Sequence, residues 1–159
     1  MKMWKTAAAA AAGLALFAGV VHAGVFDLES TLNGDNEVPP NQSEATGAAV
    51  MSYDDNTNLF FLDILVTGIN LADVIGTHIH QGASGVNGPV IVNLLANASW
   101  QQDGDDIRLT IVDGMFPEAN ELDLLTGGTY INVHTNAFPA GEIRGQLVLG
   151  GGGGDCDGG

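Results

Sequence analysis

Apolar and polar residues alternate along most of this chain in short runs, and a period of two is typical of half-buried antiparallel strands. In residues 25–32, Phe26, Leu28 and Leu32 fall on one side, and acidic and hydroxyl residues lie between them. The alternation predicts eight strands, at residues 25–32, 46–53, 58–66, 74–80, 89–95, 107–112, 129–134 and 142–149. The predicted core contains Phe26, Leu28, Phe60, Leu62, Ile79, Ile91, Ile131, Val133, Ile143 and Leu147.

Turn-forming residues separate these runs. Residues 33–40 combine glycine, asparagine and a proline pair, which together interrupt strand pairing. One short helix is expected at residues 117–125, with Leu122 and Leu125 facing the core. Many short strands with little helix predict an all-β fold, either an antiparallel β-sandwich or a flattened Greek-key barrel.

The two ends of the chain differ from the middle. Residues 1–23 have two lysines, an apolar run and small residues before Gly24, which together indicate a secretory signal peptide. Residues 150–159 are nearly all glycine and are expected to be a disordered tail. The chain is therefore expected to be a secreted or periplasmic protein with one domain at residues 24–149 and no membrane span.

Charge limits the classes of partner. The net charge is −15, and after residue 23 the only strong bases are Arg108 and Arg144. Nucleic acid is excluded, because phosphate binding needs clustered lysine and arginine. The excess of acidic residues favours the binding of a cation or a basic partner. Alternatively, it only increases solubility. The acidic turn at 102–106 lacks the ligand spacing of a known calcium loop. The single cysteine, Cys156, can form only an intermolecular disulfide.

Three histidines follow the predicted signal. His78 and His80 share one face of their strand, because alternate side chains of a strand point the same way. His134 lies in another predicted strand, on the face opposite Ile131 and Val133. Imidazole is a ligand for copper, zinc, nickel and iron. If the two strands are neighbours, all three rings meet outside the core as a metal site, with Asn132 and Gln81 as partners that orient a ring. The alternative is that the histidines are hydrogen-bonded residues that brace the loop at 82–88.

Four motifs in order resemble the CHRD domain, named for the repeats of animal chordin. They are LNGDNEVPP at 32–40, THIHQG at 77–82 with NGPV at 87–90, YINVHT at 130–135 and PAGEIRGQ at 139–146. The resemblance implies a domain that also occurs singly in exported bacterial proteins. In chordin the domain belongs to an extracellular protein that binds growth factors.

A weaker similarity is to copper–zinc superoxide dismutase, which is also a β-sandwich. That enzyme has an H-x-H copper pair, a later copper-binding histidine and then an arginine, and His78, His80, His134 and Arg144 follow the same order. The similarity implies a mononuclear copper site with Arg144 above it as an anion guide. It does not extend to the zinc site, because the chain has no histidine between His80 and His134.

Three functions are compatible with these features. The first is an exported binding or structural module with an unknown protein partner. The second is a periplasmic or extracellular copper-binding protein, and the third is a copper enzyme with dismutase-like redox activity. The sequence has no nucleophile in a recognisable activating motif, which favours a protein that is not an enzyme.

Overall fold

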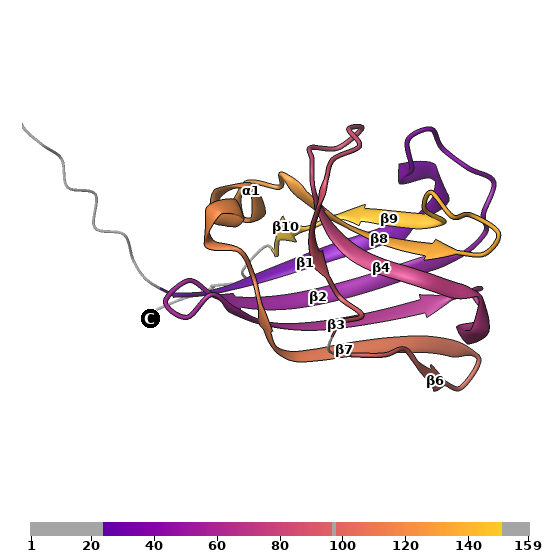
Figure 1. Ribbon diagram of the computed structural model, residues 1–159, viewed down its shortest axis with the longest axis horizontal. Helices are drawn as coiled ribbons and strands as arrows, with labels where there is room; N and C mark the ends of the chain where they lie inside the picture. Colours follow the sequence, from indigo (N-terminus) through magenta and orange to yellow (C-terminus); the bar gives the residue numbers. More distant parts are fainter. Residues whose placement is uncertain (1–23, 97, 151–159) are drawn as a thin grey trace, which may run out of the picture.

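The computed structural model describes residues 24–96 and 98–150. These residues form one curled antiparallel sheet of ten strands, which confirms the all-β prediction (Figure 1). The strands are β1 (Val25–Asn33), β2 (Thr46–Asp54), β3 (Leu59–Thr67), β4 (Val74–Gln81), β5 (Val90–Asn93), β6 (Gln101–Asp103), β7 (Asp106–Met115), β8 (Thr129–Thr135), β9 (Ile143–Gln146) and β10 (Val148–Leu149). Seven of the eight predicted strands are observed as single strands, and the eighth, at residues 142–149, is divided into β9 and β10; β6 was not predicted. The predicted signal segment and Cys156 lie outside the described residues.

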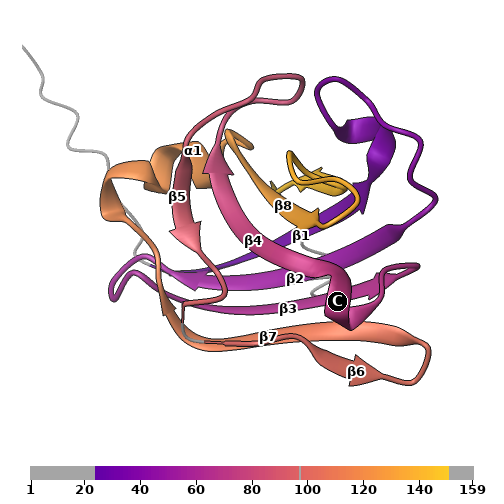
Figure 2. The ribbon, with the colours of Figure 1, turned by 45° about the vertical axis from the view of Figure 1, so that its right-hand side comes forward.

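The sheet turns back on itself at β1. The strand order is β5-β4-β8-β9-β1-β2-β3-β7-β6, with β10 also paired to β1. On one edge β1 pairs with β2 along its whole length, whereas on the other it meets β9 only at Asn33 and β10 only at Leu28 and Glu29. The half that contains β4 and β8 therefore faces the half that contains β2 and β3 (Figure 2).

The core lies between these two halves. Eight of the ten predicted core residues are buried, and Phe26 and Ile91 are partly buried and pack against the others. In β3 the buried positions are Phe60, Leu62, Ile64 and Val66, as alternation requires. Ile79 of β4 and Ile131 of β8 are fully buried, so the opposite face of these two strands looks out of the core.

The helical segment is short, and its predicted orientation was right for Leu125, which packs against the core, but wrong for Leu122. It consists of the 3₁₀ turn η3 (Glu118–Asn120) and the five-residue helix α1 (Glu121–Leu125). Leu124 is fully buried, whereas Leu122 is 74% exposed. A helix of little more than one turn has too few residues for the apolar pattern to set its orientation.

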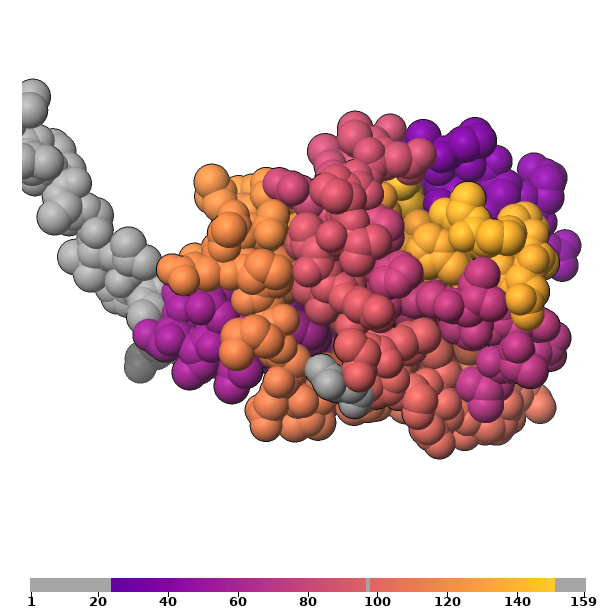
Figure 3. Space-filling view, viewed as in Figure 1, coloured from indigo at the N-terminus to yellow at the C-terminus, as the bar shows by residue number. Residues whose placement is uncertain are grey.

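Three loops lie near one another at the surface of the molecule (Figure 3), and together they surround Tyr130 and Asn132 of β8. They are the β1–β2 loop, the β4–β5 loop and the β8–β9 turn. The β1–β2 loop includes the 3₁₀ turn η1 (Gly34–Asn36). A further 3₁₀ turn, η2 (Leu71–Asp73), lies elsewhere, between β3 and β4. Asn87 Nδ2 donates to the carbonyl oxygen of Val38 at 2.8 Å, and Asn41 Nδ2 donates to that of Glu142 at 2.9 Å. These hydrogen bonds join the three loops into one rim.

No helix in the described part of the chain is long and apolar enough to cross a membrane.

Candidate metal centre

The three predicted histidines come together on the outward face of β4 and β8. In the ladder between these strands, His78 is opposite Asn132, His80 is opposite Tyr130, and Gly76 is opposite His134. A Cβ on Gly76 would lie 3.1 Å from Cε1 of His78 and 3.7 Å from Cδ2 of His134. Because position 76 has no side chain, the rings of His78 and His134 can approach each other across the ladder.

The ring positions allow a shared metal ion. Ring centroids lie 5.0 Å apart for His78 and His134, 5.7 Å for His78 and His80, and 6.0 Å for His80 and His134. One nitrogen from each ring lies within 4.8 Å of the other two. Three nitrogens bound to one metal at about 2.0–2.1 Å would be about 3–4 Å apart, so the rings need only small rotations to reach one ion.

Two backbone carbonyls determine which nitrogen of each ring is free. His80 Nδ1 lies 2.9 Å from the carbonyl oxygen of Gly88, and His134 Nδ1 lies 3.1 Å from that of Pro139. A carbonyl oxygen only accepts, so each Nδ1 carries the proton and each Nε2 keeps a lone pair. These two Nε2 atoms are buried without a hydrogen-bond partner, and so is Nδ1 of His78.

Burial also keeps two of these rings neutral. Desolvation lowers the pKa of His78 below its usual value, and the neighbouring His134 and His80 lower it further. Desolvation likewise lowers the pKa of His80, although the hydrogen bond to Gly88 opposes this effect. A neutral imidazole is the form that binds a metal.

Tyr130 supports the site from the side. Its ring stacks on His80 with a centroid distance of 4.9 Å and an interplanar angle of 9°, and the guanidinium of Arg144 lies 4.6 Å from its centroid. Because β8 lies between β4 and β9, Tyr130 separates His80 from Arg144. The Tyr130 hydroxyl also accepts a hydrogen bond from the backbone N–H of Gly88 at 3.1 Å.

Of the three predicted supporting residues, only Asn132 lies among the rings. It stands between His78 and Arg144 in the ladder, and its Oδ1 is buried without a partner. Gln81 points to the other face and donates to Asp123 of α1 at 2.7 Å. Arg144 is 2% exposed and donates from Nε to the carbonyl oxygen of Asn36 at 2.6 Å. Through these contacts Arg144 holds the β1–β2 loop, and it lies on the other side of Tyr130 from His80.

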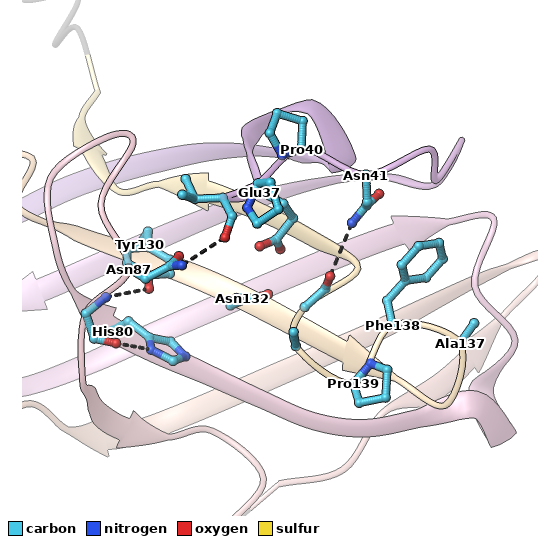
Figure 4. A pocket seen from close by; sticks show the side chains of 15 residues that line it. Glu37, Pro40, Asn41, His80, Asn87, Tyr130, Asn132, Ala137, Phe138 and Pro139 are labelled. Atoms are coloured by element: carbon cyan, nitrogen blue, oxygen red, sulfur yellow. Dashed lines mark hydrogen bonds between the residues drawn. The ribbon is translucent and has the colours of Figure 1, made fainter.

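A cavity of about 430 Å³ lies beside the histidines (Figure 4). Its walls include Pro39, Phe138 and Pro139, and its polar groups include His80, Asn132 and Glu37. Desolvation raises the pKa of Glu37 to about 7, against the opposing effects of Arg144 and the backbone N–H of Val38. Glu37 is 6% exposed, and its Oε1 has no hydrogen-bond partner.

Four contributors to this site were not identified from the sequence: the carbonyls of Gly88 and Pro139, Tyr130 and Glu37. All four lie in the motifs quoted above: Glu37 in LNGDNEVPP, Gly88 in NGPV, Tyr130 in YINVHT and Pro139 in PAGEIRGQ. The contact made by a backbone carbonyl, however, cannot be predicted from the residue type, because every residue has a backbone carbonyl.

The fold and site define an antiparallel β domain with a histidine cluster under a rim of loops. The family model of the CHRD domain matches residues 28–147, well over half of the chain. The chain belongs to the CHRD domain family, and this membership supports a role as a binding or structural module. Comparisons with curated proteins and with solved structures found no match. The similarity to superoxide dismutase therefore rests on the order of a few residues alone.

Proposed function

We propose that this CHRD domain binds one transition-metal ion, copper, through Nδ1 of His78 and Nε2 of His80 and His134, in an exported protein. One observation carries the proposal: the three rings converge, and each has a buried nitrogen without a hydrogen-bond partner among the described residues. Buried polar atoms without partners are costly, and three together on stiff strands are well suited to a cation.

The alternative role as loop braces explains less of the geometry. His80 and His134 do hold loops, through their Nδ1 atoms. That role leaves the second nitrogen of each ring without a function, and it gives His78 no function. A metal ion uses all three free nitrogens, while the two carbonyls orient the rings in the manner common to metal-binding histidines.

Copper is favoured by the ligand chemistry. Among the residues that the structure describes, the converging group contains three imidazoles and no thiolate or carboxylate. Imidazole suits zinc, copper, iron and nickel, and among divalent ions of this series copper binds most tightly to a given nitrogen site. The net charge of −15 also attracts cations to the surface.

Copper titration tests the proposal. The full chain is used with His22→Ala and Cys156→Ser, which remove the other histidine and the only thiol. We expect one Cu(II) per chain and a spin-resonance spectrum with nitrogen couplings, both lost in His78→Ala. Gln101→Ala, an exposed change on β6, serves as the control and should leave binding unchanged. Absence of stoichiometric binding, or an unaltered spectrum in His78→Ala, would contradict the proposal.

The pH dependence provides a second test. Copper competes with protons for neutral imidazole, and His78 and His80 have a pKa below the usual value of 6.5. Affinity should therefore change little between pH 8 and about 6.5, and should fall only at lower pH. Competition with a chelator of known affinity at pH 8, 7, 6 and 5 measures this. A steep loss that begins above pH 7 would disagree.

A further inference from the structure

The cavity of Figure 4 lies next to one of the proposed metal ligands, His80. The His80 ring is part of its lining, and so are Gly88 and Pro139, whose carbonyls hold the rings of His80 and His134. Asn132, the ladder partner of His78, also lines it. A small molecule in the cavity would therefore lie beside His80 and next to the ladder partner of His78.

Two side-chain oxygen atoms at this cavity receive no hydrogen bond from residues 24–96 or 98–150. Oε1 of Glu37 and Oδ1 of Asn132 are both buried without a hydrogen-bond partner, on side chains that are 6% and 4% exposed. Each of these oxygens lies 2.7 Å from the point where a Cβ on Gly141 would be. Gly141 has φ +136, and a Cβ there would also lie 2.7 Å from Nδ2 of Asn132, so only glycine lets these two side chains pack this closely against the β8–β9 turn.

The nearest cation does not supply the missing donor. Arg144 donates to the carbonyl oxygen of Asn36 and to Oδ1 of Asn87, and none of its hydrogen bonds in the described chain reaches Glu37. Its charge still acts on the Glu37 carboxyl from a distance. A buried acceptor without a donor is destabilising, and a bound ligand with N–H or O–H groups would supply the missing donor.

We infer that the metal keeps an exchangeable coordination position which opens into this cavity, and that the position takes a small neutral ligand bearing a hydrogen-bond donor, such as water or an azole. This inference rests on the proposed function. Three protein ligands are typical of metal sites that keep one position for an exogenous ligand. Glu37 and Asn132 accept the donor hydrogens of that ligand, and the Glu37 carboxylate disfavours an anion there.

The test compares three probes on the copper-loaded full chain with His22→Ala and Cys156→Ser, at pH 8. Imidazole and 1-methylimidazole both bind copper through nitrogen, but only imidazole has an N–H to donate. Azide is a small anion. Spin-resonance and visible spectra report each dissociation constant, and desalting with copper analysis verifies that the ion stays on the protein. We expect imidazole to bind about tenfold more tightly than 1-methylimidazole, as one hydrogen bond to a charged group allows.

The variant Glu37→Gln tests whether Glu37 contacts the bound ligand or only stabilises the fold. The amide removes the charge and can donate to an anion, so azide should bind about tenfold more tightly than in the parent protein, and the preference for imidazole should shrink. Glu29→Gln makes the same change at an exposed position of β1 and should alter neither. Three results would overturn the inference without contradicting the copper site. They are equal binding of the two azoles, no spectral change with any probe while copper stays bound, and no effect of Glu37→Gln. Failure to bind copper in the first titration would remove both.

Discussion

Saturation with Cu(II) should raise the melting temperature of the protein by about 10 °C, and His134→Ala should abolish that rise. A ligand that binds only the folded state at about a thousand times its Kd stabilises it by about 4 kcal/mol, and each kcal/mol is worth roughly 3 °C in a domain of this size. The effect requires a fixed geometry, because the proposed ligands come from two strands and are oriented by two loops. Scanning calorimetry with copper and with a chelator measures the difference.

Gln101→Ala is the control for this experiment and should keep the full gain in melting temperature, since it lies on the exposed strand β6. If His134→Ala gained as much stability from copper as the parent protein, the metal would be bound elsewhere and the three-histidine site would be wrong.

Gly88→Ala should weaken copper binding by about 10- to 100-fold and destabilise the fold by about 2 kcal/mol or more. The reason is steric. A Cβ at position 88 would overlap the backbone carbonyl oxygen of Gln81, so the loop must move away from β4. That movement breaks the contact of the Gly88 carbonyl with His80 and the bond from its N–H to Tyr130. Denaturant unfolding and chelator competition give the two magnitudes.

The matched control lies in the same loop. Gly85 has φ +80 and no atom within 4 Å of a Cβ, and asparagine tolerates this left-handed backbone. Gly85→Asn should therefore leave stability and copper affinity close to those of the parent protein. If both variants behaved alike, the position of the Gly88 carbonyl would not matter for the site.

The fold could be predicted because alternation acts locally on every strand. Alternation is weakest in β3, which is nearly all apolar, yet the predicted core residues Phe60 and Leu62 are both buried there. The same rule placed Ile79 and Ile131 in the core and turned the histidines outward. The apolar pattern wrongly placed Leu122 in the core, because the five-residue helix is too short for a helical period to determine its orientation.

The surroundings of the histidines depend on contacts that strand alternation does not determine. The Gly88 and Pro139 carbonyls reach the rings through loop geometry. Arg144 follows the histidines in the order expected from the dismutase similarity, yet Tyr130 stands between it and His80. Gln81 is on the same face as Ile79, so alternation itself argued against its role as a partner of the rings. Glu37 belongs to the β1–β2 loop, whose position over β8 is a tertiary property.

The two-sided pairing of β1 has a consequence for how the chain acquires its structure. One edge of β1 can pair with β2 as soon as the first hairpin forms. The other edge can pair only after β9 and β10 have been synthesised. The hydrogen bond from Asn36 to Arg144 joins residues 108 positions apart, so the sheet closes only when nearly the whole chain is available. Such long-range closure slows folding, because loop entropy is lost before the contacts form. A chain that closes last at its C-terminal strands remains open during synthesis, and an open chain is the form that can be threaded through a membrane pore.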